Sequence, residues 1–431
     1  FDAASAPLAP PPEPRFDAPG PWLAPSAELG PVEGYSVWPT LLPSYWLPRI
    51  REPVVAGATS VGGIALPRKE LLDYALGVET SGVDLVRRHA YAVYAQVFTS
   101  GGRVEGGAAY SYGGFGNPVL SVRAEQVWSS VGQILAGGGA DTLYVLGRER
   151  VIDGSATLLS ARFRRSLSLT VGGGLVWEAR DLLDTDLEPT SQYQLARPRS
   201  RLGELRVALG YSSARTFSFQ TGGASGLSAS IQGRSRRHLG LASADVGIVG
   251  TDRTFAELTG RLRAYVPLWG GGYARHVLAF QATGGAAFGP GAESGHFGVG
   301  GTSGTVEDLT GLELFGGSYL FLPVRGYPAS SRVGRYAWTG SAEYRFPLAL
   351  VNRGLGAWPL HFDRIVGSLF LDAGNAWQPG PQGSVAAAVG AEVTVGILGF
   401  WNSGLLVRTG VAAPLVAGGN PHVYVRAGLP F

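Results

Sequence analysis

The chain has 431 residues, of which 16% are charged and 45% hydrophobic, and its formal net charge is +3. The absence of cysteine excludes disulfides, thiolate metal sites and cysteine nucleophiles. The arginines are scattered rather than clustered, which argues against a nucleic-acid surface, and no apolar run reaches the roughly 18 residues that a membrane-spanning helix needs.

Residues 1–48 begin with a proline-rich segment, in which prolines recur from Pro7 to Pro31. Proline interrupts helices and β-ladders, so we expect 1–48 to be an extended linker or the remnant of an upstream domain. The first residue is not methionine, and residues 1–30 lack the basic start and apolar core of a signal peptide. We therefore expect that the original N-terminus has been lost.

Residues 49–431 are dominated by runs with a two-residue period, the period of a β-strand. At 103–112, for example, Arg103 and Glu105 share one face, while Val104 and Tyr110 lie on the other. The runs with this pattern lie at 89–98, 103–112, 119–128, 167–177, 205–211, 255–266, 277–288, 340–347, 367–373, 385–396, 405–412 and 422–431. Glycine-rich turns such as 113–118 separate them.

In these runs the charged residues share a face with serine, threonine and glycine, while aliphatic and aromatic residues take the other face. This is the alternation of a β-barrel with lipid outside and a wet lumen inside. We predict an all-β fold, a transmembrane antiparallel β-barrel of about sixteen strands in a bacterial outer membrane, with outer-membrane lipids around it. Fourteen or eighteen strands stay open, and a soluble β-sandwich is the alternative fold.

The last strand adds an end signal. Val423, Val425, Ala427, Leu429 and Phe431 alternate with polar or small residues and finish the chain on an aromatic, which is typical of outer-membrane barrels. We take Val425, Leu429 and Phe431 as the signal of this C-terminal strand. Gly428 and Pro430 form β-ladders poorly.

One connection, from 288 to about 336, is far longer than a hairpin turn and is expected to have a function. It contains Val324, Arg325, Gly326 and Tyr327, and the next two strands carry Glu343 and Asp372 on faces expected to point into the lumen. A guanidinium bonded to two carboxylates would anchor a loop folded into the barrel. Alternatively, these are unrelated surface charges.

The order of these segments resembles a known family. V-R-G-Y at 324–327, A-E-Y-R-F-P-L at 342–348, F-L-D-A-G-N-A-W at 370–377 and the terminal Phe431 are similar to the barrel of the BamA/TamA outer-membrane assembly factors, the bacterial surface antigen family. The resemblance implies sixteen strands and a sixth extracellular loop held inside by Arg325, with Gly326 and Tyr327 beside it and Glu343 and Asp372 as partners.

Family members usually carry periplasmic POTRA modules before the barrel, and none is visible in this sequence. The segment Y-S-V-W-P-T-L-L-P-S-Y-W-L-P at 35–48, with Gly82-Val83-Asp84 and Arg88-His89-Ala90-Tyr91, is similar to barrels fused to a periplasmic TolB-like propeller. The expected partners are therefore client proteins and a periplasmic domain or subunits at the N-terminal arm.

The resemblance implies a barrel that inserts or exports proteins through a lateral seam or through a lumen gated by the Val324 to Tyr327 loop. A passive pore, or a plugged barrel that anchors a periplasmic partner, is the alternative function, and a soluble β-protein is a third. The six histidines lack metal-ligand spacing, so no metal and no cofactor is expected. No nucleophile motif or catalytic carboxylate pair stands out, and enzyme activity is not expected.

Overall fold

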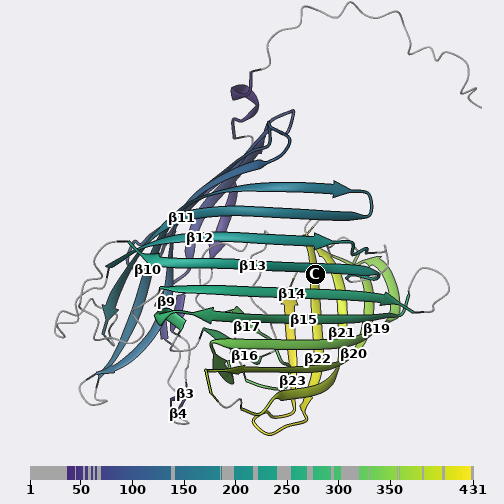
Figure 1. The fold of residues 1–431 in the computed structure, drawn as a ribbon. Coiled ribbons are helices and arrows are strands. Elements are labelled where there is room, and N and C mark those ends of the chain that lie inside the picture. The colour runs from purple at the N-terminus through teal and green to yellow at the C-terminus, as the bar shows by residue number, and fades with distance from the viewer. Residues whose placement is uncertain are drawn as a thin grey trace, which may run out of the picture.

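A computed structural model describes residues 36–43, 45–51, 54–56, 60–61, 64–65, 69–136, 141–184, 186, 199–216, 222–239, 254–268, 275–292, 296–301, 320–328, 330–356, 358, 360–380, 383–399 and 403–428. Within them the chain is almost entirely β-structure (Figure 1). The other elements are two short 3-10 turns, η1 (Trp38–Thr40) and η3 (Pro290–Ala292). No helix in this part of the chain has the length and apolar character to cross a bilayer.

Sixteen strands form one antiparallel sheet, in the order β1-β6-β7-β8-β9-β10-β11-β12-β13-β14-β15-β19-β20-β21-β22-β23. Their bounds are β1 (Leu47–Arg51), β6 (Ala75–Val83), β7 (His89–Phe98), β8 (Val104–Tyr112), β9 (Val119–Ala136), β10 (Asp141–Arg162), β11 (Arg165–Leu183), β12 (Arg199–Ser212), β13 (Gly226–His238), β14 (Phe255–Pro267), β15 (Val277–Phe288), β19 (Tyr336–Gly354), β20 (Leu360–Trp377), β21 (Ala386–Gly399), β22 (Ser403–Pro414) and β23 (His422–Gly428).

Each strand pairs with its neighbours along the chain, and the sheet curls from the purple N-terminal strands to the yellow C-terminal ones (Figure 1). The even strand number and the nearest-neighbour order are those of an outer-membrane barrel. The sheet is not closed, because the described backbone contains no pairing between β1 and β23. Both end strands are short, with five residues in β1 and seven in β23.

Exposure along the strands is the reverse of that in a soluble protein. On β12, Leu205 and Val207 are 57% and 42% exposed, whereas Glu204 between Gly203 and Leu205 is 5% exposed. The same inversion recurs on β20, where Leu369 and Leu371 are about half exposed and Asp372 is buried. Charged residues therefore line the inner face of the sheet and apolar residues cover its outer face.

The fold class predicted from the sequence is confirmed, down to the bounds of β7 and β15. β1, β6, β10 and β13 are strands that the period did not reveal. In β10 the run Arg148, Glu149, Arg150 places charges on both faces, and β13 likewise carries consecutive arginines near its end. A pattern test that assigns all charges to one face cannot find such strands.

The long connection between β15 and β19 folds against the inner face of the sheet. Its strands β16 (Phe297–Val299), β17 (Leu320–Leu322) and β18 (Arg332–Gly334) form a small separate sheet. Side chains of the connection, among them Phe297 and Val324, are buried in one cluster with inward alanines of β15, β19, β20 and β21. The loop therefore occupies space beside the wall on the lumen side.

The first connection, between β1 and β6, also carries small sheets: β2 (Val54–Ala56) pairs with β5 (Lys69–Leu72), and β3 (Ser60–Val61) pairs with β4 (Ile64–Ala65). β1 begins at Leu47, just before the barrel boundary expected from the sequence. Most of the expected linker, and the terminal residues Leu429 and Phe431, lie outside the described residues.

Candidate functional site

The candidate site is centred on Arg325, which lies in the long connection between β17 and β18. Its backbone turns at Gly326, which has a φ of +94°. A side chain at this position would be strained, and its Cβ would lie 3.0 Å from the Cβ of Ala388. Glycine therefore lets the turn approach the wall closely enough for Arg325 to reach its partners.

Arg325 and Asp372 of β20 form a bidentate pair. The Nε of Arg325 donates to Oδ2 of Asp372 at 2.6 Å, and Nη2 donates to Oδ1 at 2.7 Å. The backbone N–H of Arg325 also donates to Oδ2, at 3.2 Å, and the hydroxyl of Ser341 on β19 donates to Oδ1 at 2.7 Å. A planar fork held at both ends fixes the direction of the side chain as well as its position.

Glu343 of β19 is the second acid. Its Oε1 accepts from Nη2 of Arg325 at 2.9 Å, and its Oε2 accepts from Nε of Arg345 at 2.8 Å. Ser341 and Glu343 lie two positions apart and so face the same side of β19. The structure thus brings Arg325, Glu343 and Asp372 together; Arg325 and Asp372 are buried, and the side chain of Glu343 is 12% exposed.

An aromatic ring completes the floor of the site. The Cζ of Arg325 lies 3.5 Å from the ring centroid of Phe370 on β20, a cation–π geometry. Phe370 pairs across the sheet with Gly390 of β21, where a Cβ would collide with the ring of Phe370 and with the backbone oxygen of Val411. Glycine at 390 therefore makes room for the ring beneath the guanidinium.

Two residues that the sequence did not single out extend the site towards the last strand. Glu392 of β21 places Oε2 3.6 Å from Nη1 of Arg325, within ion-pair range but beyond a hydrogen bond. The same oxygen accepts from the hydroxyl of Tyr424 on β23 at 2.8 Å. Glu392 was detectable as the charged member of an inward-facing series in its strand, but its link to Tyr424 depends on strand order.

We call the set Arg325, Ser341, Glu343, Phe370, Asp372, Glu392 and Tyr424 the anchor network. Burial alone would lower the pKa of the Arg325 guanidinium, but the charge of Glu343 and the hydrogen bond and charge of Asp372 outweigh burial and hold that pKa well above its ordinary value. Arg325 is therefore a permanent cation. The described residues contain no cluster of acids and histidines arranged to hold a metal ion.

Tyr327 holds the other side of the turn. It is buried, and its hydroxyl lies 2.7 Å from the backbone oxygen of Val416 and 3.1 Å from that of Ala387. These two oxygens belong to β21 and to the connection after β22. The residues Val324 to Tyr327 thus contact the wall from β19 to the β22–β23 connection.

A second buried polar contact fixes the start of the same connection. His296 lies between the rings of Phe255 and Phe297, at centroid distances of 4.7 and 4.9 Å, and its Nε2 bonds to Glu257 of β14. Arg234 of β13 also reaches Glu257, at 2.6 Å. This pair could not be predicted from strand patterns, because His296 stands in an irregular segment.

The predicted C-terminal strand signal is placed only in part. Val425 faces outward and is 68% exposed, as is the outward Val423 at 71%. Leu429 and Phe431 lie outside the described residues. The structure does not bring Val425 to the anchor network; the neighbouring inward residue, Tyr424, provides that contact.

Comparison with solved structures identifies a shared fold. BamA from Haemophilus ducreyi lacking POTRA domains 1–3 matches with a TM-score of 0.51 and 12% identity, over 89% of this chain and 70% of that one. The chain is BamA-like in fold. At this identity the likeness establishes architecture only, so the roles of individual residues rest on the contacts given above.

CdiB from Escherichia coli matches with a TM-score of 0.47 and 15% identity, over 89% of this chain and 67% of that one. CdiB from Acinetobacter baumannii matches with a TM-score of 0.47 and 12% identity, over 89% and 65%. No protein family and no curated protein matches the chain in sequence. None of the comparisons supports the propeller-fused variant in particular.

Proposed function

We propose that this protein is an outer-membrane assembly or translocation barrel that passes client β-strands or polypeptides at the seam between β1 and β23. In this proposal the anchored connection sets the state of the seam. The observation that carries the proposal is the anchor network itself, which joins the inward-folded connection to Tyr424 on the strand at the seam.

Residence in a membrane is supported by the inverted exposure of the strands. Outward Val, Leu and Ile side chains on neighbouring strands form a continuous apolar surface, as on β12 with Leu205, Val207 and Leu209. Soluble monomers rarely expose apolar areas of this extent. The buried arginines and carboxylates on the other face suit a wet lumen, and a barrel of this type belongs in a bacterial outer membrane.

The proposal that the sheet has a seam is supported by the properties of its two edge strands, β1 and β23. β1 contains Pro48, which has no backbone N–H to donate, and both edge strands are shorter than the strands beside them. An edge strand presents unpaired backbone groups, which another strand can pair with by β-augmentation. Such an edge is a site where a client strand would add to the sheet.

The test is a disulfide cross-link between the two edge strands. The chain has no cysteine, so no native thiol competes with the introduced pair. Ile50 and Val425 both face outward on the two edge strands. The variant Ile50→Cys/Val425→Cys, reconstituted in liposomes, should form a disulfide when oxidised and should then lose its ability to fold or insert a urea-denatured client barrel. Reduction should restore that activity.

The matched control is Leu262→Cys/Ala282→Cys, a directly opposed pair on the interior strands β14 and β15. Its oxidation should leave client insertion unchanged. If the seam cross-link forms and insertion continues, the assembly proposal is wrong. A barrel that inserts no client but conducts strongly once Arg325 is replaced by alanine would instead be a pore plugged by its own loop.

Residues before β1 are the expected contact for a periplasmic domain or subunits. Aromatic side chains near the start of β1 are exposed, with Trp38 at 80% and Trp46 at 59%. Exposed aromatics next to a membrane wall suit either the lipid interface or a partner surface. We include a periplasmic partner at this arm in the proposed function, with client proteins as the other partner.

A further inference from the structure

One row of side chains on the outer face differs from the apolar surface around it. Gln126, Arg150, Trp177 and Arg201 stand directly opposite one another across β9, β10, β11 and β12, and we call these four residues the outer row. The next pair of residues on the same face, two positions nearer the β10–β11 turn, is apolar: Ile152 is 50% exposed and Leu175 is 43% exposed. The exposed apolar surface therefore ends at the outer row, and beyond it Trp128 and Leu146 are buried in one cluster with Leu71 and Leu72 of the β1–β6 connection.

The arginines of this row lack the partners that the lumen arginines have. On the inner face Arg123 lies 3.3 Å from Asp153, and Arg236 lies 2.8 Å from Glu204. Arg150 donates only to the neutral amide of Gln126, at 2.6 Å, and both Arg150 and Arg201 are exposed. Within the described part of the chain, neither forms an ion pair. Their positive charge is left for an external anion.

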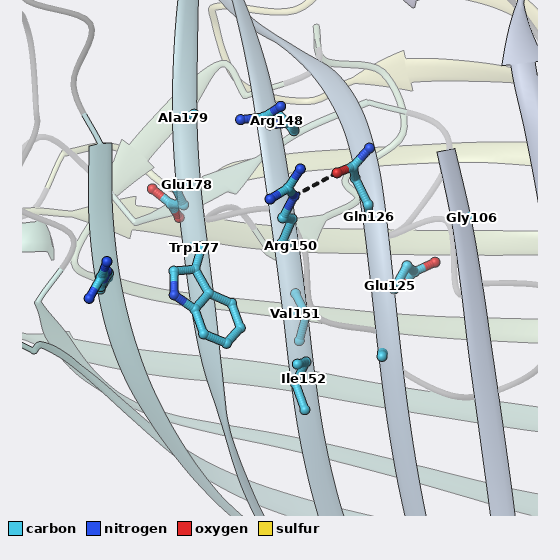
Figure 2. A pocket seen from close by; sticks show the side chains of 12 residues that line it. Gly106, Glu125, Gln126, Arg148, Arg150, Val151, Ile152, Trp177, Glu178 and Ala179 are labelled. Atoms are coloured by element: carbon cyan, nitrogen blue, oxygen red, sulfur yellow. Dashed lines mark hydrogen bonds between the residues drawn. The ribbon is translucent and has the colours of Figure 1, made fainter. Parts of the chain in front are cut away.

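The outer row borders a hollow of about 760 Å³ that is lined by residues of β8 to β12 (Figure 2). Arg148, two positions from Arg150 on the same face of β10, also lines the hollow. Its Cζ lies 5.5 Å from the ring centroid of Trp128. Two acids touch the hollow, but Glu125 accepts from Tyr94 and Glu178 pairs with Arg236. The hollow falls within the size range of ligand sites, roughly 300–1,000 Å³.

The position of the row along the strands corresponds to one face of a bilayer. Arg162 and Arg165 end the same outer face at the β10–β11 turn, opposite each other. From Arg162 to Arg150 an extended strand covers roughly 40 Å, and a tilt of about 40° reduces this to roughly 30 Å across the membrane. The outer row lies at the end of the sheet that carries the long connection, the extracellular end in a barrel of this class.

We propose that the outer row is a binding site for the phosphorylated headgroup of a glycolipid in the outer leaflet. Paired guanidinium groups bind phosphate oxygens through several hydrogen bonds, and the indole of Trp177 suits the boundary between acyl chains and headgroups. The site rests on the membrane orientation of the proposed function, and it is independent of any client activity.

The test is equilibrium binding of fluorescent diphosphorylated lipid A to the full chain in maltoside micelles. Arg150→Gln/Arg201→Gln should weaken binding about thirtyfold, the loss expected for two arginines at an anionic lipid surface. The control Arg162→Gln/Arg165→Gln removes the same charge from the other end of the same strands and should change binding less than about threefold. Heat-shifted migration in gels checks that each variant is folded.

Equal binding by the wild type and the Arg150/Arg201 variant would overturn the proposal, as would an equal loss in the control. Displacement of the lipid by inorganic phosphate at the same concentration would assign the site to free phosphate instead. If the double variant does not fold, Arg201→Gln alone should weaken binding about fivefold. Failure of client insertion would leave these binding results unchanged, so the two proposals fail separately.

Discussion

Replacing Arg325 should release the inward-folded connection from the wall. Arg325→Gln removes a buried cation that donates to Asp372 and Glu343 and stacks on Phe370. Breaking a buried ion pair by removing one partner costs about 3–5 kcal/mol. Since 1.4 kcal/mol is a factor of ten, the lower value shifts the balance between docked and undocked connection by about 150-fold.

A single reporter cysteine measures this shift, because the chain has no other thiol. Ala376 of β20 is 8% exposed and belongs to the apolar cluster beneath the connection. In Ala376→Cys, maleimide labelling of the buried thiol requires the connection to move away from the wall. When docking is fast relative to labelling, the labelling rate reports the undocked fraction, and Arg325→Gln should raise that rate at least about a hundredfold.

The matched control is Arg345→Gln, which removes a neighbouring lumen arginine that bonds to Glu343 but lies on β19 rather than in the connection. It should raise labelling less than about fivefold, because Asp372 and Glu343 still hold Arg325. Labelling of Arg325→Gln at the rate of Arg345→Gln would refute the anchoring argument. Equal rates would mean that the apolar cluster alone holds the connection.

Three further changes test the surroundings of the site. Tyr424→Phe removes a hydrogen bond to a buried carboxylate and should lower stability by about 1.5 kcal/mol, seen as a lower urea midpoint in liposomes; an unchanged midpoint would show that the bond is not formed. Gly390→Ala should cost about 1–3 kcal/mol through overpacking, whereas Gly383→Ala, with nothing within 4 Å of the added Cβ, should be nearly neutral in the same assay. His296→Leu leaves Glu257 without one buried partner and should speed proteolysis of the connection about tenfold; wild-type cleavage kinetics would contradict that role.

Much of the barrel could be predicted because lipid on the outside and water on the inside impose an alternation of apolar and polar residues on most strands. The bounds of β7 and β15 follow directly from it. β10 was missed because Arg148 and Arg150 put charge on the outer face. These outward charges of β10 lie at the proposed lipid site. A strand departs from the alternating pattern where its outer surface meets lipid headgroups rather than acyl chains.

Only those parts of the candidate site that follow from the alternation of inward and outward side chains along a strand could be predicted from the sequence. This alternation placed Glu343 and Asp372 on inward faces, and the order of the motifs indicated Arg325. The contributions of Phe370 and Tyr424 depend on which strands are neighbours and on how deeply the connection enters, and neither follows from one-dimensional spacing. His296 and Glu257 meet for the same reason, across a fold that brings an irregular segment to β14.

The shared carboxylate of Glu392 makes the two ends of the anchor network thermodynamically reciprocal. Whatever displaces Tyr424 from Glu392 alters the electrostatic support of Arg325, and whatever withdraws Arg325 alters the hold on Tyr424 by the same free energy. A molecule that binds the β15–β19 connection and withdraws Arg325 would thus act on the sheet edge without touching it.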